Sequence, residues 1–161
     1  MKPISARIVE KIRIKMSQSM PEEIPEIIEQ FADDQPLILA FLMSAYDDIL
    51  NQVELEALLY LGVAVWKMMR HGGRPSAMVS EKRLDEVEAI NLKMLEYLDG
   101  ESERDFENTV RMIIDNYNQV EVLRFVIEEL MEDSEDDEDF RDENIGIMMI
   151  ALKTVIDCLD T

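Results

Sequence analysis

Paired carboxylates are the residues of this chain whose type and spacing could do chemistry. Acidic residues three apart recur along it, for example Glu23 with Glu26, Glu26 with Glu29, Asp85 with Glu88, Glu96 with Asp99, and Glu129 with Glu132. Residues at this spacing share one helix face, so two carboxylates can hold Mg²⁺ against a substrate diphosphate. This pattern predicts, as an alternative function, a Mg²⁺-dependent all-α phosphohydrolase. Its specificity is low, because 36 of the 161 residues are acidic.

The single histidine and the single cysteine give little support to other catalysis. His71 precedes Gly72 and Gly73, so we expect it at a helix C-terminus, where glycine accepts the left-handed cap. Cys158 lies in an apolar stretch and is expected to be a buried, unreactive thiol in a reducing, cytoplasmic compartment. No nucleotide-binding glycine motif and no nucleophile motif occurs. We therefore expect no catalytic residue, no cofactor and no metal site.

The densest charge lies in one acidic stretch. It comprises Glu132, Asp133, Glu135, Asp136, Asp137, Glu138 and Asp139, interrupted only by Ser134. An EF-hand loop starting at Glu132 would place Glu143 at its twelfth position, but Asp137 stands where the sharp turn needs glycine. We expect a solvated, mobile loop here and not a calcium site.

The chain as a whole is strongly acidic, with 36 acidic and 16 basic residues and a formal net charge of −20. Such a surface repels nucleic-acid phosphates and anionic lipids, so we expect neither nucleic acid nor membrane as a partner. Residues 1–20 are the exception: five cations (Lys2, Arg7, Lys11, Arg13 and Lys15) stand against Glu10 alone, a net of +4. We expect this basic segment to fold back onto acidic neighbours, the alternative being a membrane-surface helix.

Methionine is unusually frequent, with twelve residues in the chain. Met68-Met69 and Met148-Met149 are doublets, and adjacent helical residues point about 100° apart, so one of each pair can face the core and the other a groove. Methionine fills irregular cores, and it also lines surfaces that accept varied partner helices. Core filling is the simpler interpretation. The functional one is a groove formed by Trp66, Met68 and Met69 that takes an amphipathic helix.

Helical periodicity runs through the whole chain, with proline and glycine at the joints. The expected helices are 5–18, 21–34, 36–50, 51–71, 81–98, a pattern over 102–131 broken near 116–119, and 144–159. The longest apolar run, Ala57 to Trp66, is shorter than the roughly 18–20 residues of a spanning helix and predicts a buried core helix. The predicted class is all-α, with about eight helices.

The second half of the chain weakly repeats the first. Apolar positions recur in three stretches: 87–94 repeats 9–16, 113–117 repeats 27–31, and 123–127 repeats 37–41. The offset grows from 78 to 86 residues, as loop insertions between repeated helical units would cause, although shared periodicity alone can produce such matches. We expect a single domain, 1–161, with related four-helix halves 1–71 and 80–161 and a linker at 72–79. The halves would pack as a short HEAT-like solenoid or as a single helical bundle.

Together these features favour a non-enzymatic adaptor or regulatory module that binds a basic or amphipathic protein segment. The acidic field would speed the encounter and the methionine-lined groove would supply affinity. Trp66, Met68, Met69 and the acidic residues of 132–139 are the expected contacts. The alternatives are the Mg²⁺-dependent phosphohydrolase and a DNA-mimic inhibitor, which needs charge along one continuous face. A homodimer is a further option, because so apolar a set of helices can leave a patch uncovered.

Overall fold

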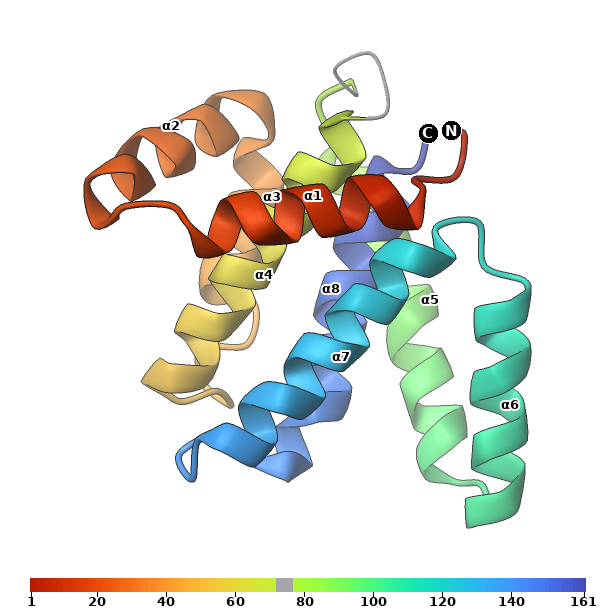
Figure 1. The fold of residues 1–161 in the computed structure, drawn as a ribbon. Coiled ribbons are helices and arrows are strands. Elements are labelled where there is room, and N and C mark those ends of the chain that lie inside the picture. Colours follow the sequence, from red (N-terminus) through yellow and green to blue (C-terminus); the bar gives the residue numbers. More distant parts are fainter. Residues whose placement is uncertain (72–76) are drawn as a thin grey trace.

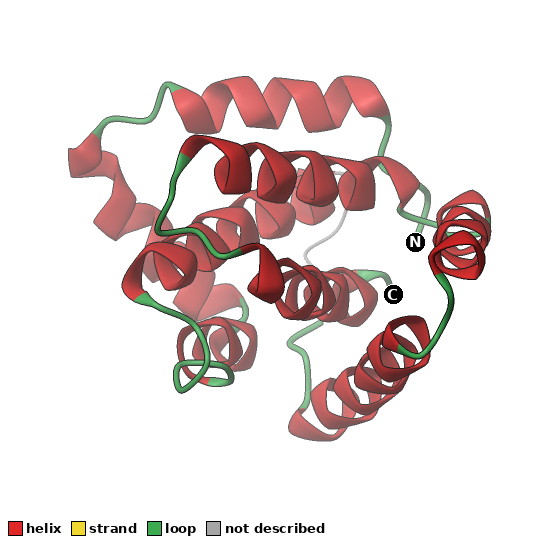
Figure 2. Ribbon diagram, turned by 90° about the horizontal axis from the view of Figure 1, so that it is seen from below, coloured by secondary structure: helices red, strands yellow, loops and turns green. Residues whose placement is uncertain are grey.

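Eight α-helices make up most of residues 1–71 and 77–161, the part of the chain that the computed structural model describes (Figures 1 and 2). They are α1 (Ala6–Ser17), α2 (Ile24–Asp34), α3 (Pro36–Ser44), α4 (Gln52–His71), α5 (Glu81–Asp99), α6 (Glu103–Asp115), α7 (Val120–Asp136) and α8 (Ile145–Leu159). Short 3₁₀ turns, Pro21–Glu23 and Asp142–Asn144, precede α2 and α8. These residues contain no strand, so the predicted all-α class is confirmed. None of the described helices is long and apolar enough to span a membrane.

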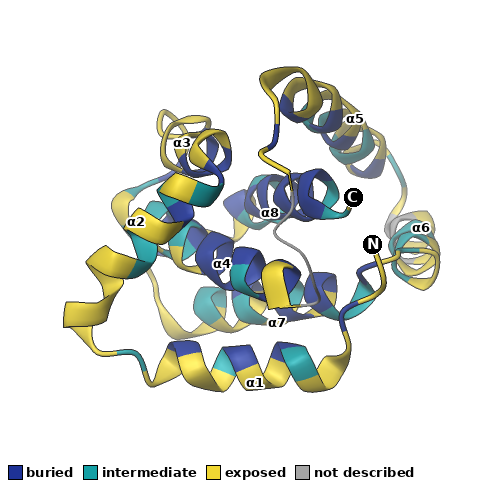
Figure 3. Cartoon of the chain, turned by 90° about the horizontal axis from the view of Figure 1, so that it is seen from above, coloured by how far each residue is buried: buried dark blue, intermediate teal, exposed yellow. Residues whose placement is uncertain are grey.

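The C-terminal helix α8 lies at the centre of the fold. It packs against α4, α5 and α7 (Figures 1 and 3), and ten of its fifteen residues are buried on all sides of the helix. Helix α4 is the second central element, with every residue from Leu61 to Trp66 buried. A helix segment that is apolar all round belongs in a core. The predicted core run is thus confirmed from Leu61 to Trp66, whereas Tyr60 within it is 43 % exposed.

The remaining helices cover this pair. Helix α1 crosses α4 and α7, while α2 and α3 pack against α4 and against each other (Figure 1). Helix α6 packs at the outside against α5 and α7. The two termini lie side by side, with the amino group of Met1 3.5 Å from Asp160.

Local sequence signals determine several helix starts. The side chains of Ser80 and Ser102 each accept a hydrogen bond from the backbone N–H three residues later, as N-caps do. At the start of α4, the N–H of Glu54 donates to the Asn51 side chain at 2.9 Å and the N–H of Asn51 donates to the Glu54 carboxylate at 3.0 Å. These two reciprocal hydrogen bonds form a capping box.

One predicted boundary is wrong. The third helix ends at Ser44, and the residues up to Leu50, predicted as helix, form turns. These turns bury both Tyr46 and Leu50, and Tyr46 donates a 2.7 Å hydrogen bond to Glu88 of α5. Tertiary packing therefore overrides a helical pattern that is locally consistent.

Two buried glutamines connect distant parts of the chain. Gln35, just before α3, accepts a hydrogen bond from the N–H of Val79 at 2.9 Å and donates to the carbonyl of Ala77. Gln119, just before α7, accepts from the N–H of Ile4 at 2.9 Å and donates to the carbonyl of Lys2. Each amide thus binds the extended segment that precedes a helix of the other half. The predicted linker 72–79 lies outside the described residues except for its last three.

A buried ion pair ties α4 to the turn before α8. The carboxylate of Glu54 is fully buried and accepts hydrogen bonds from the Arg141 guanidinium at 2.9 and 3.0 Å and from Asn144 at 2.9 Å. Burial alone would raise the pKa of this carboxyl, but the bonds from Arg141, Asn51 and Asn144 outweigh it and lower the pKa of Glu54 to about 2. Glu54 is therefore ionised in the folded protein at neutral pH.

Candidate functional site

The residues predicted to line a groove lie in α4 and are almost fully covered. Met68 is 0 %, Trp66 2 % and Met69 4 % exposed, because α1, α3 and α8 pack around this helix. Met68 and Met69 fill the core, which is the simpler of their two predicted roles. Trp66 shows an edge to a pocket described below. Contact of these residues with a partner stays a prediction.

The acidic stretch is exposed over most of its length but is only partly a loop. Residues 132–136 form the end of α7, and the loop predicted for the whole stretch begins at Asp137. Burial and then the nearby carboxylates, of which Glu132 contributes most, raise the pKa of Asp133. Arg13 of α1 lies 3.0 Å from Glu129 and 3.8 Å from Glu132, so the basic first helix does fold back onto acidic neighbours.

The carboxylate pairs do not converge. In the described ranges no group of three or more His, Cys, Asp or Glu side chains is placed to hold a metal ion. His71 ends α4, and Cys158 is 1 % exposed. Burial raises the pKa of the Cys158 thiol to about 11, Arg83 acts against this rise and Asp157 adds to it, so the thiol is protonated at neutral pH.

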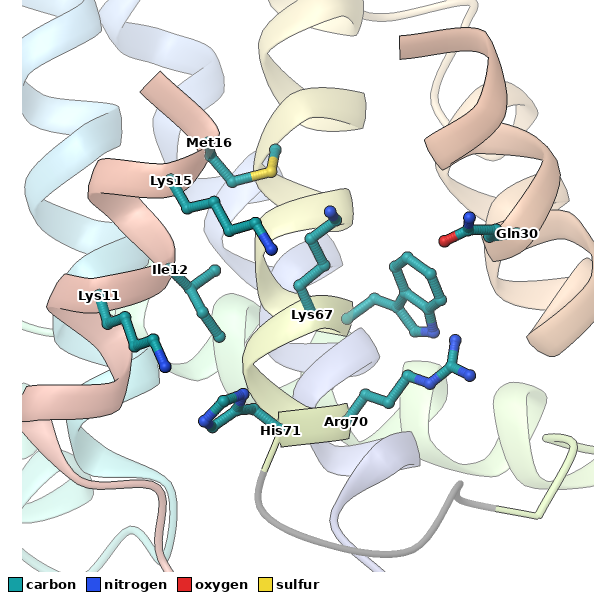
Figure 4. Close-up of a pocket in the computed structure, with 9 residues that line it drawn as sticks. Lys11, Ile12, Lys15, Met16, Gln30, Lys67, Arg70 and His71 are labelled. Carbon is teal, nitrogen blue, oxygen red and sulfur yellow. The ribbon is translucent and has the colours of Figure 1, made fainter. Parts of the chain in front are cut away.

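A cavity of about 330 Å³ opens between α1, α2 and α4 (Figure 4). We call it the cationic pocket; its lining residues are Lys11, Ile12, Lys15, Met16, Gln30, Trp66, Lys67, Arg70 and His71. Figure 4 shows Lys15 and Lys67 directed from α1 and α4 into the space between these helices. Among the residues that the structure describes, no carboxylate lines this pocket.

Helix spacing brings these cations together. Lys11 and Lys15 are one turn apart on α1, and Lys67, Arg70 and His71 lie three and four residues apart on α4, so each set shares one helix face. The face of α1 next to the lysines, which includes Ile12 and Met16, is buried against the protein. Burial of that face against α4 brings both sets to the same cavity.

The charges in the cationic pocket are not neutralised. Within residues 1–71 and 77–161, none of Lys11, Lys15, Lys67 and Arg70 forms an ion pair. Burial and then the charge of Lys15 lower the pKa of Lys67, with Glu23 acting in the opposite direction. A bound anion would therefore offset the repulsion between these cationic side chains, which no ion pair within the described part of the protein offsets.

One wall of the cationic pocket is rigid. The Trp66 indole donates a 2.7 Å hydrogen bond to Asp34 and stacks on Phe31 with the ring centroids 4.9 Å apart. The guanidinium of Arg70 lies over this indole, 5.4 Å from the ring centroid. These contacts orient Arg70 at the pocket before any ligand arrives.

An apolar cavity of about 480 Å³ lies next to the cationic pocket. We call it the apolar groove; its lining residues are Met16, Ser17, Ser19, Ile24, Ile27, Ile28, Glu56, Leu59, Tyr60 and Val63. Met16 lines both cavities. Both cavities use one face of α4, which presents Tyr60 and Val63 to the groove and Lys67 to the pocket. We call the two adjacent cavities together the cleft, which is apolar at one end and cationic at the other.

The second half of the chain has a polar network between α5 and α8. Lys153, only 8 % exposed, lies 2.6 Å from the Asp157 carboxylate and donates to Asn91 at 3.0 Å. Tyr117 donates to Asp157 at 2.6 Å, and its ring lies 4.8 Å from the Lys153 ammonium. Here a buried cation has its own carboxylate, unlike the lysines of the cationic pocket.

Sequence reasoning missed this cleft although part of its signal was visible. Lys11 and Lys15 belong to the basic segment 1–20, which was expected to fold back onto acidic neighbours, and of its five cationic side chains only Arg13 forms an ion pair in the described part of the chain. Comparison of the chain with protein-family models, with curated proteins and with solved structures finds no match.

Proposed function

We propose that this protein is a non-enzymatic binding module whose cationic pocket takes a small anionic ligand. The observation that supports this most is the convergence of four cationic side chains, without a lining carboxylate among the described residues, in a chain of net charge −20. Clustered cations in a partly buried site repel one another, and a bound anion converts that repulsion into attraction. The site is largely formed before binding, which favours affinity.

Size and overall charge favour a small anion over a polyanion. The pocket volume of about 330 Å³ lies in the range of roughly 300–1,000 Å³ that is typical of small-molecule sites. Because residues 1–20 have a net charge of +4 and the whole chain −20, residues 21–161 sum to −24. A nucleic acid or an acidic protein would be repelled by this negative charge over a large surface, whereas a compact anion contacts mainly the pocket.

Replacing Lys67 by glutamine tests this function. At low ionic strength we expect inorganic phosphate to bind, and Lys67→Gln to weaken its affinity about tenfold through loss of one charge-assisted contact. Calorimetric titration measures both. Lys82→Gln is the matched control, since Lys82 has the same charge on α5 and is 85 % exposed. Equal affinity of the two variants, or no phosphate binding by the wild type, would contradict the proposal.

A second candidate function is the binding of a basic protein segment by the acidic end of α7. The contact of Arg13 with Glu129 and Glu132 supports it, because a guanidinium already lies on this surface. Replacing the carboxylates of residues 135–139 by Ser and Gln should remove a basic partner captured from native lysate, or lower the salt concentration at which it elutes. Unchanged capture and unchanged salt dependence would exclude this function.

We also propose that the chain consists of two related four-helix halves, and burial supports this. The buried positions of α1 and α5 coincide at an offset of 75 residues: Val9 with Leu84, Ile12 with Val87, and Met16 with Asn91. Those of α3 and α7 coincide at an offset of 84: Ile38 with Val122, Leu39 with Leu123, Phe41 with Phe125, and Leu42 with Val126. Residues 61–69 of α4 and 151–159 of α8 have the same order of burial at an offset of 90.

The packing of the halves favours a single bundle over a stacked solenoid. The related helices α4 and α8 pack on each other, and α1 packs on α7. Gln35 and Gln119 occupy related positions, 84 residues apart, and each binds the segment before the first helix of the other half. Such reciprocal contacts are expected of two units related by a pseudo-two-fold axis.

Glutamine replacements test this relation. Gln35→Leu and Gln119→Leu should each lower the free energy of unfolding by about 1–3 kcal/mol, because each leaves a buried backbone N–H without its acceptor. Urea unfolding measures the change, and Gln52→Leu serves as the control because Gln52 is exposed. A loss confined to one of the two positions would argue against equivalent roles.

A further inference from the structure

We infer that the ligand is an amphipathic anion, with its anionic head group in the cationic pocket and an alkyl or acyl chain in the apolar groove. This inference rests on the proposed anion site and adds the class of molecule that binds there. Its basis is the adjacency of the two cavities, which share Met16 as a lining residue and lie along one face of α4. The combined cleft matches a molecule with charge at one end only.

The apolar groove offers a ligand few polar contacts. Its lining includes one carboxylate, Glu56, which accepts a hydrogen bond from Gln52 at 2.8 Å. Its two serine hydroxyls are engaged, since Ser17 donates to the carbonyl of Ile14 at 2.7 Å and Ser19 donates to that of Lys15 at 3.1 Å. Ile24 and Tyr60, which also line it, are 51 % and 43 % exposed. A sugar or a nucleobase would lose hydrogen bonds to water in this groove, whereas a hydrocarbon chain would gain by leaving water.

The second half supplies an internal comparison. The counterpart of the apolar groove, obtained with the offsets of the related helices, includes Val110, Ile113 and Ile114 of α6 and Met149 and Lys153 of α8, and its cavity measures only about 20 Å³. There α6 packs against α5 and α7, whereas α2 packs mainly against α3 and α4. Among the described residues, the groove of about 480 Å³ in the first half therefore has a counterpart that is almost closed.

The charge distribution argues for a small molecule over an acidic peptide helix. A peptide helix laid along α4 from Tyr60 to His71 is roughly 10–12 Å wide with its side chains, so its flanking acidic side chains would meet a body whose residues 21–161 sum to −24. Repulsion by that field grows with each additional acidic residue. A single head group on an apolar chain places its only charge next to Lys15, Lys67 and Arg70.

Alkyl phosphates of increasing length test the inference. Calorimetric titration with ethyl, butyl, hexyl and octyl phosphate, below their micelle concentrations, should show affinity rising up to about fourfold per methylene until the groove is filled. Octanol should bind more weakly than octyl phosphate, and octanoate shows whether a carboxylate head is accepted as well. Phosphate affinity that is independent of chain length would overturn the amphipathic ligand but leave the anion site standing. No phosphate binding at any length would overturn both.

A charge placed in the groove gives a second test. Ile24→Glu should reduce the ratio of octyl to ethyl phosphate affinity at least tenfold. The glutamate carboxylate stays hydrated, so the octyl chain loses an apolar contact and would have to displace that water. The fold should tolerate it, since Ile24 is 51 % exposed and begins α2, where an acidic residue suits the helix dipole. Met43→Glu is the matched control on α3, where the side chain is 57 % exposed and lines neither cavity. An acidic amphipathic peptide that binds when octyl phosphate does not would overturn the small-molecule inference.

Discussion

Glu54→Ala is expected to lower the free energy of unfolding by about 3 kcal/mol. The substitution leaves the Arg141 guanidinium and the Asn144 amide without their shared acceptor, and breaking a buried ion pair from one side typically costs about 3–5 kcal/mol. The lower end applies here because the Arg141 side chain is 42 % exposed and water can reach it. Urea unfolding measures the loss, with Glu22→Ala as a control at an exposed acidic position. A change as small as that of the control would contradict the assignment.

The same carboxylate makes stability depend on pH. The pKa of Glu54 is about 2 in the folded protein and about 4.5 without these contacts, so its contribution is complete above about pH 4.5 and is lost as the pH falls toward 2. For a shift of this size the contribution is on the order of 3 kcal/mol. Glu54→Gln keeps the shape of the side chain and cannot titrate. The difference in stability between wild type and Glu54→Gln should therefore shrink on acidification, and a constant difference would contradict this role of Glu54.

The capping contact of Glu54 with Asn51 was predictable from the sequence, and its ion pair with Arg141 was not. Asn51 and Glu54 have the spacing of a capping box, which depends only on residues three apart. Arg141 lies 87 residues further along the chain, and nothing in its surroundings indicates a partner in α4. The caps at Ser80 and Ser102 were predictable for the same local reason.

The candidate site was harder to predict because α4 is apolar on nearly every side. Hydrophobic periodicity shows which face of an amphipathic helix is buried. A helix that is apolar on nearly every side has no polar face, so periodicity cannot assign its buried face. Met68 and Met69 were therefore assigned to a groove as an alternative to the core that they fill. Lys67 and Lys15 are distant in sequence, and only the crossing of α1 over α4 brings them to one cavity.

The offset between the halves illustrates the same limit. Apolar matching of α1 with α5 indicates an offset of 78 residues, whereas their buried positions coincide at 75. The difference is three residues, close to one helical turn, and residues three apart lie on the same helix face. Hydrophobic periodicity alone therefore cannot distinguish an offset of 78 residues from one of 75, whereas the buried positions in the folded protein can.

Asp157→Ala is expected to lower the free energy of unfolding by about 3–5 kcal/mol, because it leaves the Lys153 ammonium buried without a carboxylate. Asn91 and Tyr117 lose hydrogen bonds to the same group. Adding Lys153→Met should recover a large part of the loss, since it removes the uncompensated charge and keeps an apolar side chain of similar length. Urea unfolding of the two single variants and the double variant gives this coupling, and strictly additive losses would contradict it.

Lys67 of α4 and Asp157 of α8 are 90 residues apart and correspond in the proposed duplication, yet their replacement should have opposite effects. Asp157 neutralises a buried lysine, so its loss destabilises the protein. No carboxylate lines the described part of the pocket around Lys67, and burial and then the charge of Lys15 lower its pKa, with Glu23 acting in the opposite direction. Lys67→Gln should therefore leave the unliganded protein as stable as the wild type or more so, while weakening phosphate binding. A residue that weakens the free protein and strengthens the complex is expected at a binding site and not in a structural network. Unfolding curves recorded with and without phosphate measure both effects, and destabilisation by Lys67→Gln in the absence of phosphate would contradict this assignment.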